Sequence, residues 1–374
     1  MTTPDPRWTD EALDAFRQVG DPPADQAVRE VFATGSVSEV NKLMRTLVRN
    51  DMPPPEQMPP SLYNYFDLTD NLPDWADLDA IARSQDFFVR HGLLAIMILG
   101  CYSLPVCYAA PKGVKVIYES ARLYSDARRR VLETAQLLLD SFAPGGLAPT
   151  GTGVRSAQKV RLMHAAVRTL LLNRGWDTAE LGIPINQEDL VGTLGAFGFY
   201  FMDGLQKLNV RFTTQEADDY IHTWNVIGHI MGIQRALHPQ NFAEATYLAG
   251  RIQDRNFAGT QEGKALQEAL TNYMQSVLPG KAFDGLPVAL TRHFLGNERA
   301  DIVELPRSDW TQLSLVPFRV FNTVLSNANQ EIPPVARAVE LFSQKMIENL
   351  LLMERGGERS HFHIPETLRE AWKM

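Results

Sequence analysis

The sequence predicts an all-α fold in which helices surround a central pocket, and three observations support this prediction. Segments with apolar residues three and four positions apart follow one another through most of the chain, as amphipathic helices require. Runs typical of strands, such as Val303 to Leu305, are too short and isolated to build a sheet. Residue pairs that cap helix N-termini, Asn186 with Asp189 and Thr213 with Glu216, stand directly before helical patterns.

The composition is that of a globular protein that can bury a large core. The 374 residues are 45% hydrophobic and 21% charged, which separates the chain from the disordered class. The formal net charge is −8 and the pI is about 5.6. Because binding to phosphate backbones needs a basic surface, we expect no nucleic-acid partner.

The first 70 residues are expected to form a helical or irregular cap on a main helical domain of residues 71–374. Residues 9–35 predict a short helix that starts at Thr9 or Asp10 and is broken by prolines 22 and 23. A second helix is predicted for residues 38–50. The segment MPPPEQMPP after it predicts an extended arm, because proline removes a donor and fixes φ.

Two features of the sequence bear on the cellular compartment. The N-terminus has neither the basic nor the apolar region of a signal peptide, so we expect a cytoplasmic protein, or a secreted one whose leader has been removed. The only cysteines, Cys101 and Cys107, lie in an apolar run without metal-ligand spacing, which indicates buried thiols in a reducing compartment.

That apolar run, residues 92–110, contains no charged residue over a length that could cross a bilayer. Gly100, Ser103 and Pro105 interrupt it, and an all-round apolar helix also suits the centre of a large protein. We therefore interpret it as a buried core helix rather than a transmembrane one. Weak membrane association stays open.

Two helices in the middle of the chain carry polar residues along one face. In the helix predicted for residues 126–142, Arg130, Glu133 and Thr134 converge at i, i+3 and i+4. In the segment VRLMHAAVRTLLL, His164 lies between two arginines, Arg161 and Arg168, on the same face.

An imidazole in that position is a plausible iron ligand, and the flanking guanidiniums would suit the propionates of a haem. The spacing alone is equally compatible with a core histidine and with arginines on a solvated face.

Downstream, Asn186 is predicted to cap one bulky helix that continues to Leu208 and carries Phe197, Phe199, Tyr200 and Phe201. Core packing is the expected role for most of these rings, with at least one available to line an apolar channel.

The helix after Thr213 places His222 and His229 seven residues apart on one face. A core histidine, a partner to another ligand and a second metal ligand are all open readings for them. The spacing gives little support to a zinc or di-iron site.

The ordered motifs RVLET, a Gly-rich loop, VRLMHAAVR, PINQEDLVGTLGAF and YIHTWNVIGHIMGI resemble the family of latex clearing proteins, bacterial rubber oxygenases grouped with the MpaB-type oxygenases. The resemblance runs from about residue 72 to about residue 305. It implies a globin-like helical core around haem b, with additional N- and C-terminal helices, and oxidation of isoprenoid double bonds by O2. It also implies that His164 is the proximal iron ligand and that Arg130 and Thr134 lie on the distal side.

One position departs from the resembled family. The rubber-cleaving members carry a lysine that can itself bind iron where this chain has Glu133. A carboxylate is a poor axial ligand, so the departure predicts an open or water-filled distal site in which Glu133 accepts a proton. Two functions remain: a haem-dependent oxygenase acting on a small hydrophobic, isoprenoid-like substrate, or a binder of haem or hydrophobic ligands without turnover.

Overall fold

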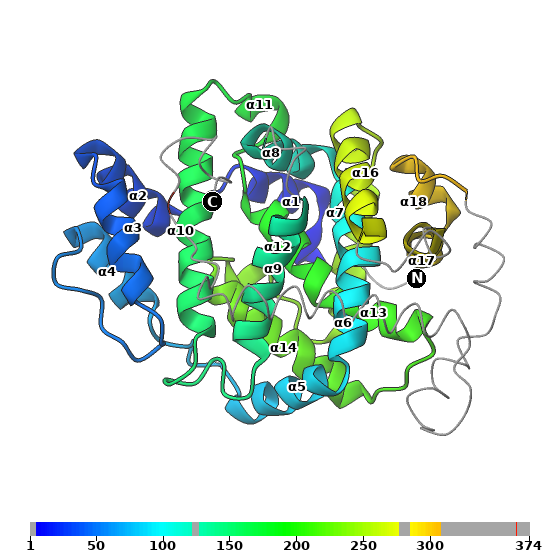
Figure 1. Ribbon diagram of the computed structural model, residues 1–374, viewed down its shortest axis with the longest axis horizontal. Helices are drawn as coiled ribbons and strands as arrows, with labels where there is room; N and C mark the ends of the chain where they lie inside the picture. The colour runs from blue at the N-terminus through cyan, green and yellow to red at the C-terminus, as the bar shows by residue number, and fades with distance from the viewer. Residues whose placement is uncertain (1–4, 122–126, 277–284, 308–363, 365–374) are drawn as a thin grey trace.

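The computed structural model describes residues 5–121, 127–276, 285–307 and 364, and throughout these ranges the regular structure is helical (Figure 1). The predicted all-α class is confirmed. The helices enclose a large hydrophobic core that contains residues from Trp8 to Leu305, and a second core lies between the N-terminal helices and α10.

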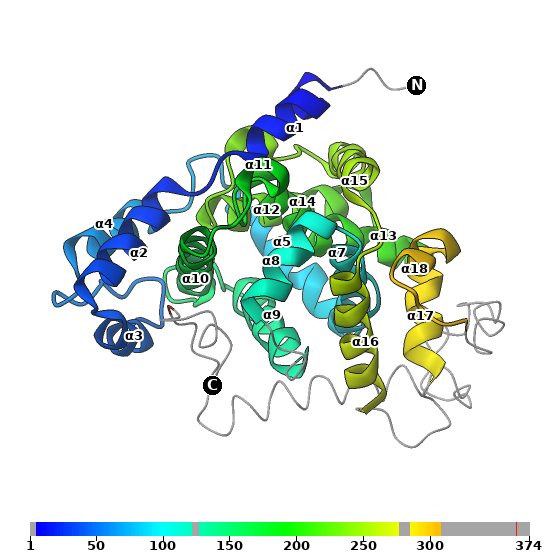
Figure 2. The same ribbon diagram turned by 90° about the horizontal axis from the view of Figure 1, so that it is seen from above.

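The N-terminal segment folds into a short 3-10 turn and four α-helices. Their bounds are η1 Pro6–Trp8, α1 Asp10–Arg17, α2 Pro22–Thr34, α3 Val37–Thr46 and α4 Pro60–Thr69. Thr9 caps α1 as predicted. Pro22 does not only break a helix, however, but occupies the first position of α2, where its missing N–H is not needed. Figures 1 and 2 place α2, α3 and α4 on the side of α10 that faces away from α9.

Most of the uncharged run is buried, as predicted, including Cys101, but Cys107 is only half-buried, and the run is not one helix. It divides into α6 (Gly92–Ile98), the π-helical turn η2 (Leu99–Ser103) and α7 (Leu104–Tyr108), after the amphipathic α5 (Leu78–Arg90). The break precedes Pro105, which has no N–H to donate to the preceding turn.

The composition of this region also allows weak membrane association. Within the described ranges, no single helix is both long and apolar enough to cross a bilayer. Among the described helices, one pair, Leu78–Arg90 and Leu94–Tyr108, reaches that length and composition together, and it is bent by 84°.

Helices α9 (Ala127–Phe142) and α10 (Gly153–Asn173) pack against each other, and α10 also contacts α8 (Pro111–Ala121). Asp140 fixes the tight connection between them, because its carboxylate accepts hydrogen bonds from Gln136, Thr152 and Ser156. The side chains of residues 127–133 lie outside the described part of the structure.

The helix predicted from Asn186 to Leu208 is instead two helices, α12 (Gln187–Phe197) and α13 (Phe199–Lys207), after the single turn α11 (Thr178–Leu181). They separate at Gly198, where a Cβ would lie 3.5 Å from Trp224 and Ile221. Both predicted caps are confirmed: Asn186 accepts from the Asp189 N–H, and Thr213 with Glu216 forms a capping box at the start of α14 (Thr214–Ile230).

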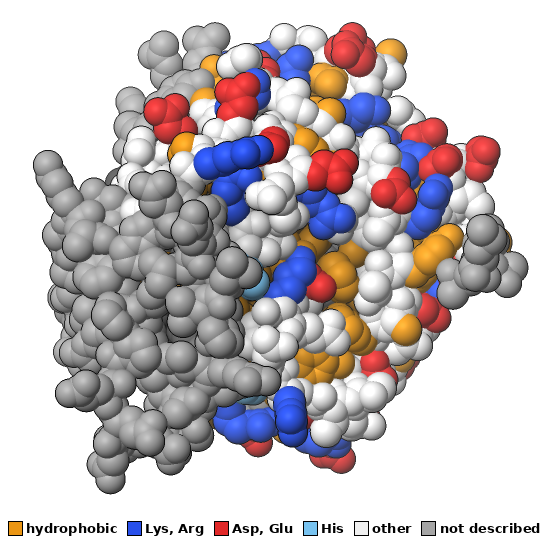
Figure 3. All heavy atoms as spheres, turned by 90° about the vertical axis from the view of Figure 1, so that its right-hand side faces the viewer, with side chains coloured by type: hydrophobic (Ala, Val, Ile, Leu, Met, Phe, Trp, Pro, Cys, Tyr) orange, Lys and Arg blue, Asp and Glu red, His pale blue; other side chains and the backbone are white. Residues whose placement is uncertain are grey.

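The remaining described helices close the far side of the core. They are η3 Arg235–Leu237, α15 Phe242–Asn256, α16 Gln261–Ser276, α17 Gly285–Leu295 and α18 Asn297–Ile302. On the described part of the surface drawn in Figure 3, basic and acidic side chains are intermixed. This mixture of both signs is consistent with the similar numbers of basic (36) and acidic (44) residues in the sequence.

Candidate active site

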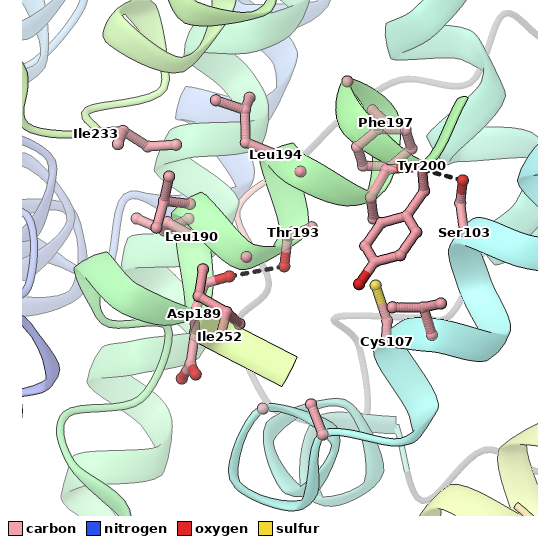
Figure 4. Close-up of a pocket in the computed structure, with 18 of the residues that line it drawn as sticks. Ser103, Cys107, Asp189, Leu190, Thr193, Leu194, Phe197, Tyr200, Ile233 and Ile252 are labelled. Atoms are coloured by element: carbon pink, nitrogen blue, oxygen red, sulfur yellow. Dashed lines mark hydrogen bonds between the residues drawn. The ribbon is translucent and has the colours of Figure 1, made fainter. Parts of the chain in front are cut away.

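A cavity of about 320 Å³ lies inside the helical core, bordered mainly by apolar side chains of α7 to α10 and α12 to α15. Figure 4 shows the part around α12, where Leu190, Leu194 and Phe197 stand opposite Ile252 and Cys107. Its volume is at the lower end of the range for small-molecule sites. Of the four predicted aromatic residues, Phe197, Phe199 and Tyr200 line the cavity, whereas Phe201 packs against Phe87 and Tyr220.

His164 is on the wall of this cavity. Burial and, to a smaller extent, the nearby charge of Arg168 together lower the pKa of its imidazole to about 4. The ring is therefore neutral at pH 7, and a ring nitrogen keeps a lone pair. Its Nδ1 atom is buried and has no hydrogen-bond partner in the described part of the chain. A buried ring nitrogen that no protein group occupies stays available to a ligand.

Helix α9 brings Thr134 to the same cavity. The structure thus places Thr134 and His164, which are far apart in sequence, around one space. Arg130 and Glu133 belong to the same helix, but their side chains lie outside the described part of the structure. Their predicted distal roles stay predictions.

The two arginines that flank His164 have protein partners instead of facing the cavity. Arg161 makes a bidentate pair with Asp21, with Nε and Nη2 at 2.6 and 2.8 Å from the carboxylate oxygens, and donates to the Ile230 carbonyl at 2.9 Å. Arg168 pairs with Asp25 and donates to the carbonyls of Pro184 and Ile185.

These contacts argue against the predicted propionate-binding role of Arg161 and Arg168. Both side chains are buried, and neither belongs to the residues that line the cavity. Arg161, His164 and Arg168 share one helix face, as their spacing predicts, but the two guanidiniums extend from it to Asp21 and Asp25 while His164 reaches the cavity. The ion pairs fasten the N-terminal helix α2 to α10, and the close approach of Gly232 (φ 86°) leaves room for the Arg161–Asp21 pair.

The sequence reasoning missed a second ionic cluster beside the cavity. Glu188, in the first turn of α12, is buried and pairs with Arg17 at 3.0 Å and Arg255 at 3.1 Å. Arg17 also reaches Asp189 at 3.1 Å, whose pKa is raised by burial. The cluster joins α1, α12 and α15. Only the acidic first turn of α12 was visible in the sequence, and the arginines come from distant helices.

His222 and His229 pack edge-on against Trp75 together with His238, with ring centroids 5.8, 5.9 and 5.8 Å from the indole. His222 Nε2 accepts the Asp77 N–H at 2.9 Å. Among the described residues, no three or more His, Cys, Asp or Glu side chains converge to hold a metal ion. The three histidines and Trp75 join the segment before α5 to α14 and to the residues after η3. The sequence spacing related only His222 and His229.

Comparison with known proteins agrees with this architecture. Residues 88–327 match the family described as "ER-bound oxygenase mpaB/B'/Rubber oxygenase, catalytic domain". The rubber oxygenase of Streptomyces sp. (strain K30) is 27% identical over 354 residues, which is 94% of this chain and 86% of the relative. The structure of latex clearing protein LCP in the closed state has a TM-score of 0.78 at 26% identity, covering 93% of this chain and 94% of that one. Because the family match spans more than half of the sequence, the chain belongs to this family of oxygenases.

Proposed function

We propose that the protein is a haem b-dependent oxygenase that uses O2 to oxidise a carbon–carbon double bond of an apolar, isoprenoid-like molecule. The observation that carries the proposal is His164: a neutral imidazole with an unpartnered buried nitrogen on the wall of an apolar cavity. The rubber oxygenase relative supports the substrate class.

The residues around the cavity fit a haem. His164 would hold the iron of the group through a ring nitrogen, and the apolar side chains of the cavity would suit a flat macrocycle and an alkene. A bound haem would supply the site at which O2 is activated. Arg161 and Arg168 are not part of this proposal, because their hydrogen bonds go to Asp21, Asp25 and backbone carbonyls.

The described residues have clear tasks in such a reaction. Buried walls exclude water from the reacting carbons, which strengthens the few polar contacts inside the cavity. The Thr134 hydroxyl can donate a hydrogen bond to a polar atom of the bound oxidant or product. We assign Arg130 and Glu133 by chemistry alone: a fixed positive charge, and a carboxylate able to accept a proton.

Two reaction outcomes differ in their need for electrons. Cleavage of C=C by one O2 places one oxygen atom in each of two carbonyl groups and consumes no external reductant. Hydroxylation would place one oxygen atom in the substrate and reduce the other to water, which needs two electrons and two protons. Product analysis in the presence and absence of a reductant distinguishes the two, and stable binding without any product would identify a ligand binder.

The first test is a visible spectrum of the purified protein with a matched pair of histidine variants. His164→Ala should remain helical by circular dichroism but lose or loosen the haem. His229→Ala is the control, because His229 is exposed on a neighbouring helix and does not line the cavity. Full haem content in His164→Ala together with haem loss in His229→Ala would contradict the proposal.

A second variant tests the distal assignment. Glu133→Gln removes the proton acceptor but keeps the shape of the side chain, so we expect normal haem content and loss of most turnover. The electron paramagnetic resonance spectrum of the resting protein should show no nitrogen ligand to the iron other than that of His164. Turnover at the wild-type rate would assign Glu133 a bracing role only, and a second nitrogen ligand would refute the open distal site.

A further inference from the structure

Helix α12 presents a glycine to the cavity at a place where a side chain would have room. A Cβ atom built on Gly195 would meet no other heavy atom within 4 Å, and Gly195 is one of the residues that line the cavity. The backbone there is helical, without a positive φ. Neither the backbone conformation nor a close neighbour therefore requires glycine at this position.

Glycine inside a helix is unfavourable by roughly 1 kcal/mol relative to alanine, because it loses more backbone freedom on folding. The two other glycines of this segment have local contacts that Gly195 lacks. A Cβ on Gly192 would lie 3.5 Å from Ile252, and one on Gly198 would lie 3.4 Å from the Leu194 carbonyl oxygen. At Gly195, the cavity space next to the missing side chain is the one local feature that glycine preserves.

We propose that Gly195 determines which substrates fit. Its missing side chain keeps open a part of the cavity that accepts the additional isoprene units of longer apolar substrates. This inference rests on the proposed function, in which the cavity takes an isoprenoid. The apolar side chains of Val191 and Leu194, which lie on the same helix and line the cavity, would contact the hydrocarbon, and a larger residue at position 195 would occupy its place.

A second helical glycine outside the cavity provides a matched control for this proposal. Gly250 is also inside a helix, α15, and a Cβ there would likewise meet nothing within 4 Å. It does not line the cavity. Gly195→Leu and Gly250→Leu therefore make the same chemical change in the same type of backbone, and only the first reduces the space inside the cavity.

The experiment measures binding of prenyl alcohols with two, three and four isoprene units to the haem-loaded protein, by displacement of a fluorescent apolar dye. For Gly195→Leu we expect at least a tenfold loss of affinity for the four-unit alcohol and less than a twofold change for the two-unit alcohol. Gly250→Leu should bind all three as the wild type does. Gly195→Ala is a smaller change, for use if the leucine variant folds poorly. It should lose less affinity than Gly195→Leu, again most for the four-unit alcohol, and its melting temperature should be about 1–3 °C above that of the wild type.

Each outcome decides the proposal. An equal loss of affinity for all chain lengths, a fall in haem content, or unchanged binding in Gly195→Leu would overturn the role of Gly195 and leave the proposed function standing. Failure of the wild-type protein to bind any prenyl alcohol would overturn the proposed substrate class, and this inference with it.

Discussion

The buried pair of Arg161 and Asp21 allows a test of what holds the N-terminal helices on the core. Asp21→Leu removes the carboxylate and leaves the guanidinium buried without its counter-charge. The side chain of Asp21 is only 3% exposed, and it makes no capping bond to α2, so the substitution acts mainly through the ion pair. Breaking a buried pair from one side typically costs about 3–5 kcal/mol.

The double variant Asp21→Leu/Arg161→Met replaces both charges by apolar groups. Replacement of a whole buried pair is often close to neutral, and here the Ile230 carbonyl also loses a donor, at a cost of roughly 1–3 kcal/mol. We therefore expect the double variant to be more stable than Asp21→Leu. Glu39→Gln serves as the control, because Glu39 and its partner Lys42 are 72% and 63% exposed, and such pairs contribute well under about 1 kcal/mol.

Urea unfolding followed by circular dichroism gives the stability, and the visible spectrum of the same samples gives the haem content. The reasoning fails if Asp21→Leu and Glu39→Gln lose equally little stability. It also fails if the double variant is folded but has lost its haem, because Arg161 would then bind the cofactor after all.

Three further predictions concern other parts of the molecule. Burial, Arg235 and His229 lower the pKa of His238 from 6.5 to about 3, so the unfolded chain binds a proton that the folded chain does not. The stability contributed by the neutral imidazole is complete above pH 6.5 and falls toward pH 3, by up to about 5 kcal/mol from this residue. His238→Leu should therefore flatten that part of a plot of urea midpoint against pH, and an unchanged slope would assign the loss elsewhere. Thr213→Ala removes one half of the capping box and should cost about 1 kcal/mol in the same unfolding assay, with no change in haem content. Gly204→Ala should destabilise by about 1–3 kcal/mol despite the better helix propensity of alanine, because the new methyl group would lie 2.8 Å from Ile98; a rise in melting temperature would contradict the packing.

Local sequence patterns, such as helix caps and uncharged runs, predicted much of the fold correctly. The capping pairs at Asn186 and Thr213 begin helices where the sequence placed them, because a cap acts on N–H groups two or three residues away. The uncharged run around Cys101 is buried, as its composition required. The breaks at Gly198 and before Pro105 were harder to place, since neighbouring helices select among the possible interruptions.

For the candidate site too, the sequence predicted some features and only the tertiary structure showed the others. The sequence determined that the chain is helical, that it resembles an oxygenase family, and that His164 and its two arginines share a helix face. Only the tertiary structure decided what that face meets. His164 reaches the cavity, while Arg161 turns to Asp21, just before α2, and Arg168 to Asp25 on α2. Helical periodicity relates residues within one helix and carries no information about which element packs against each part of its surface.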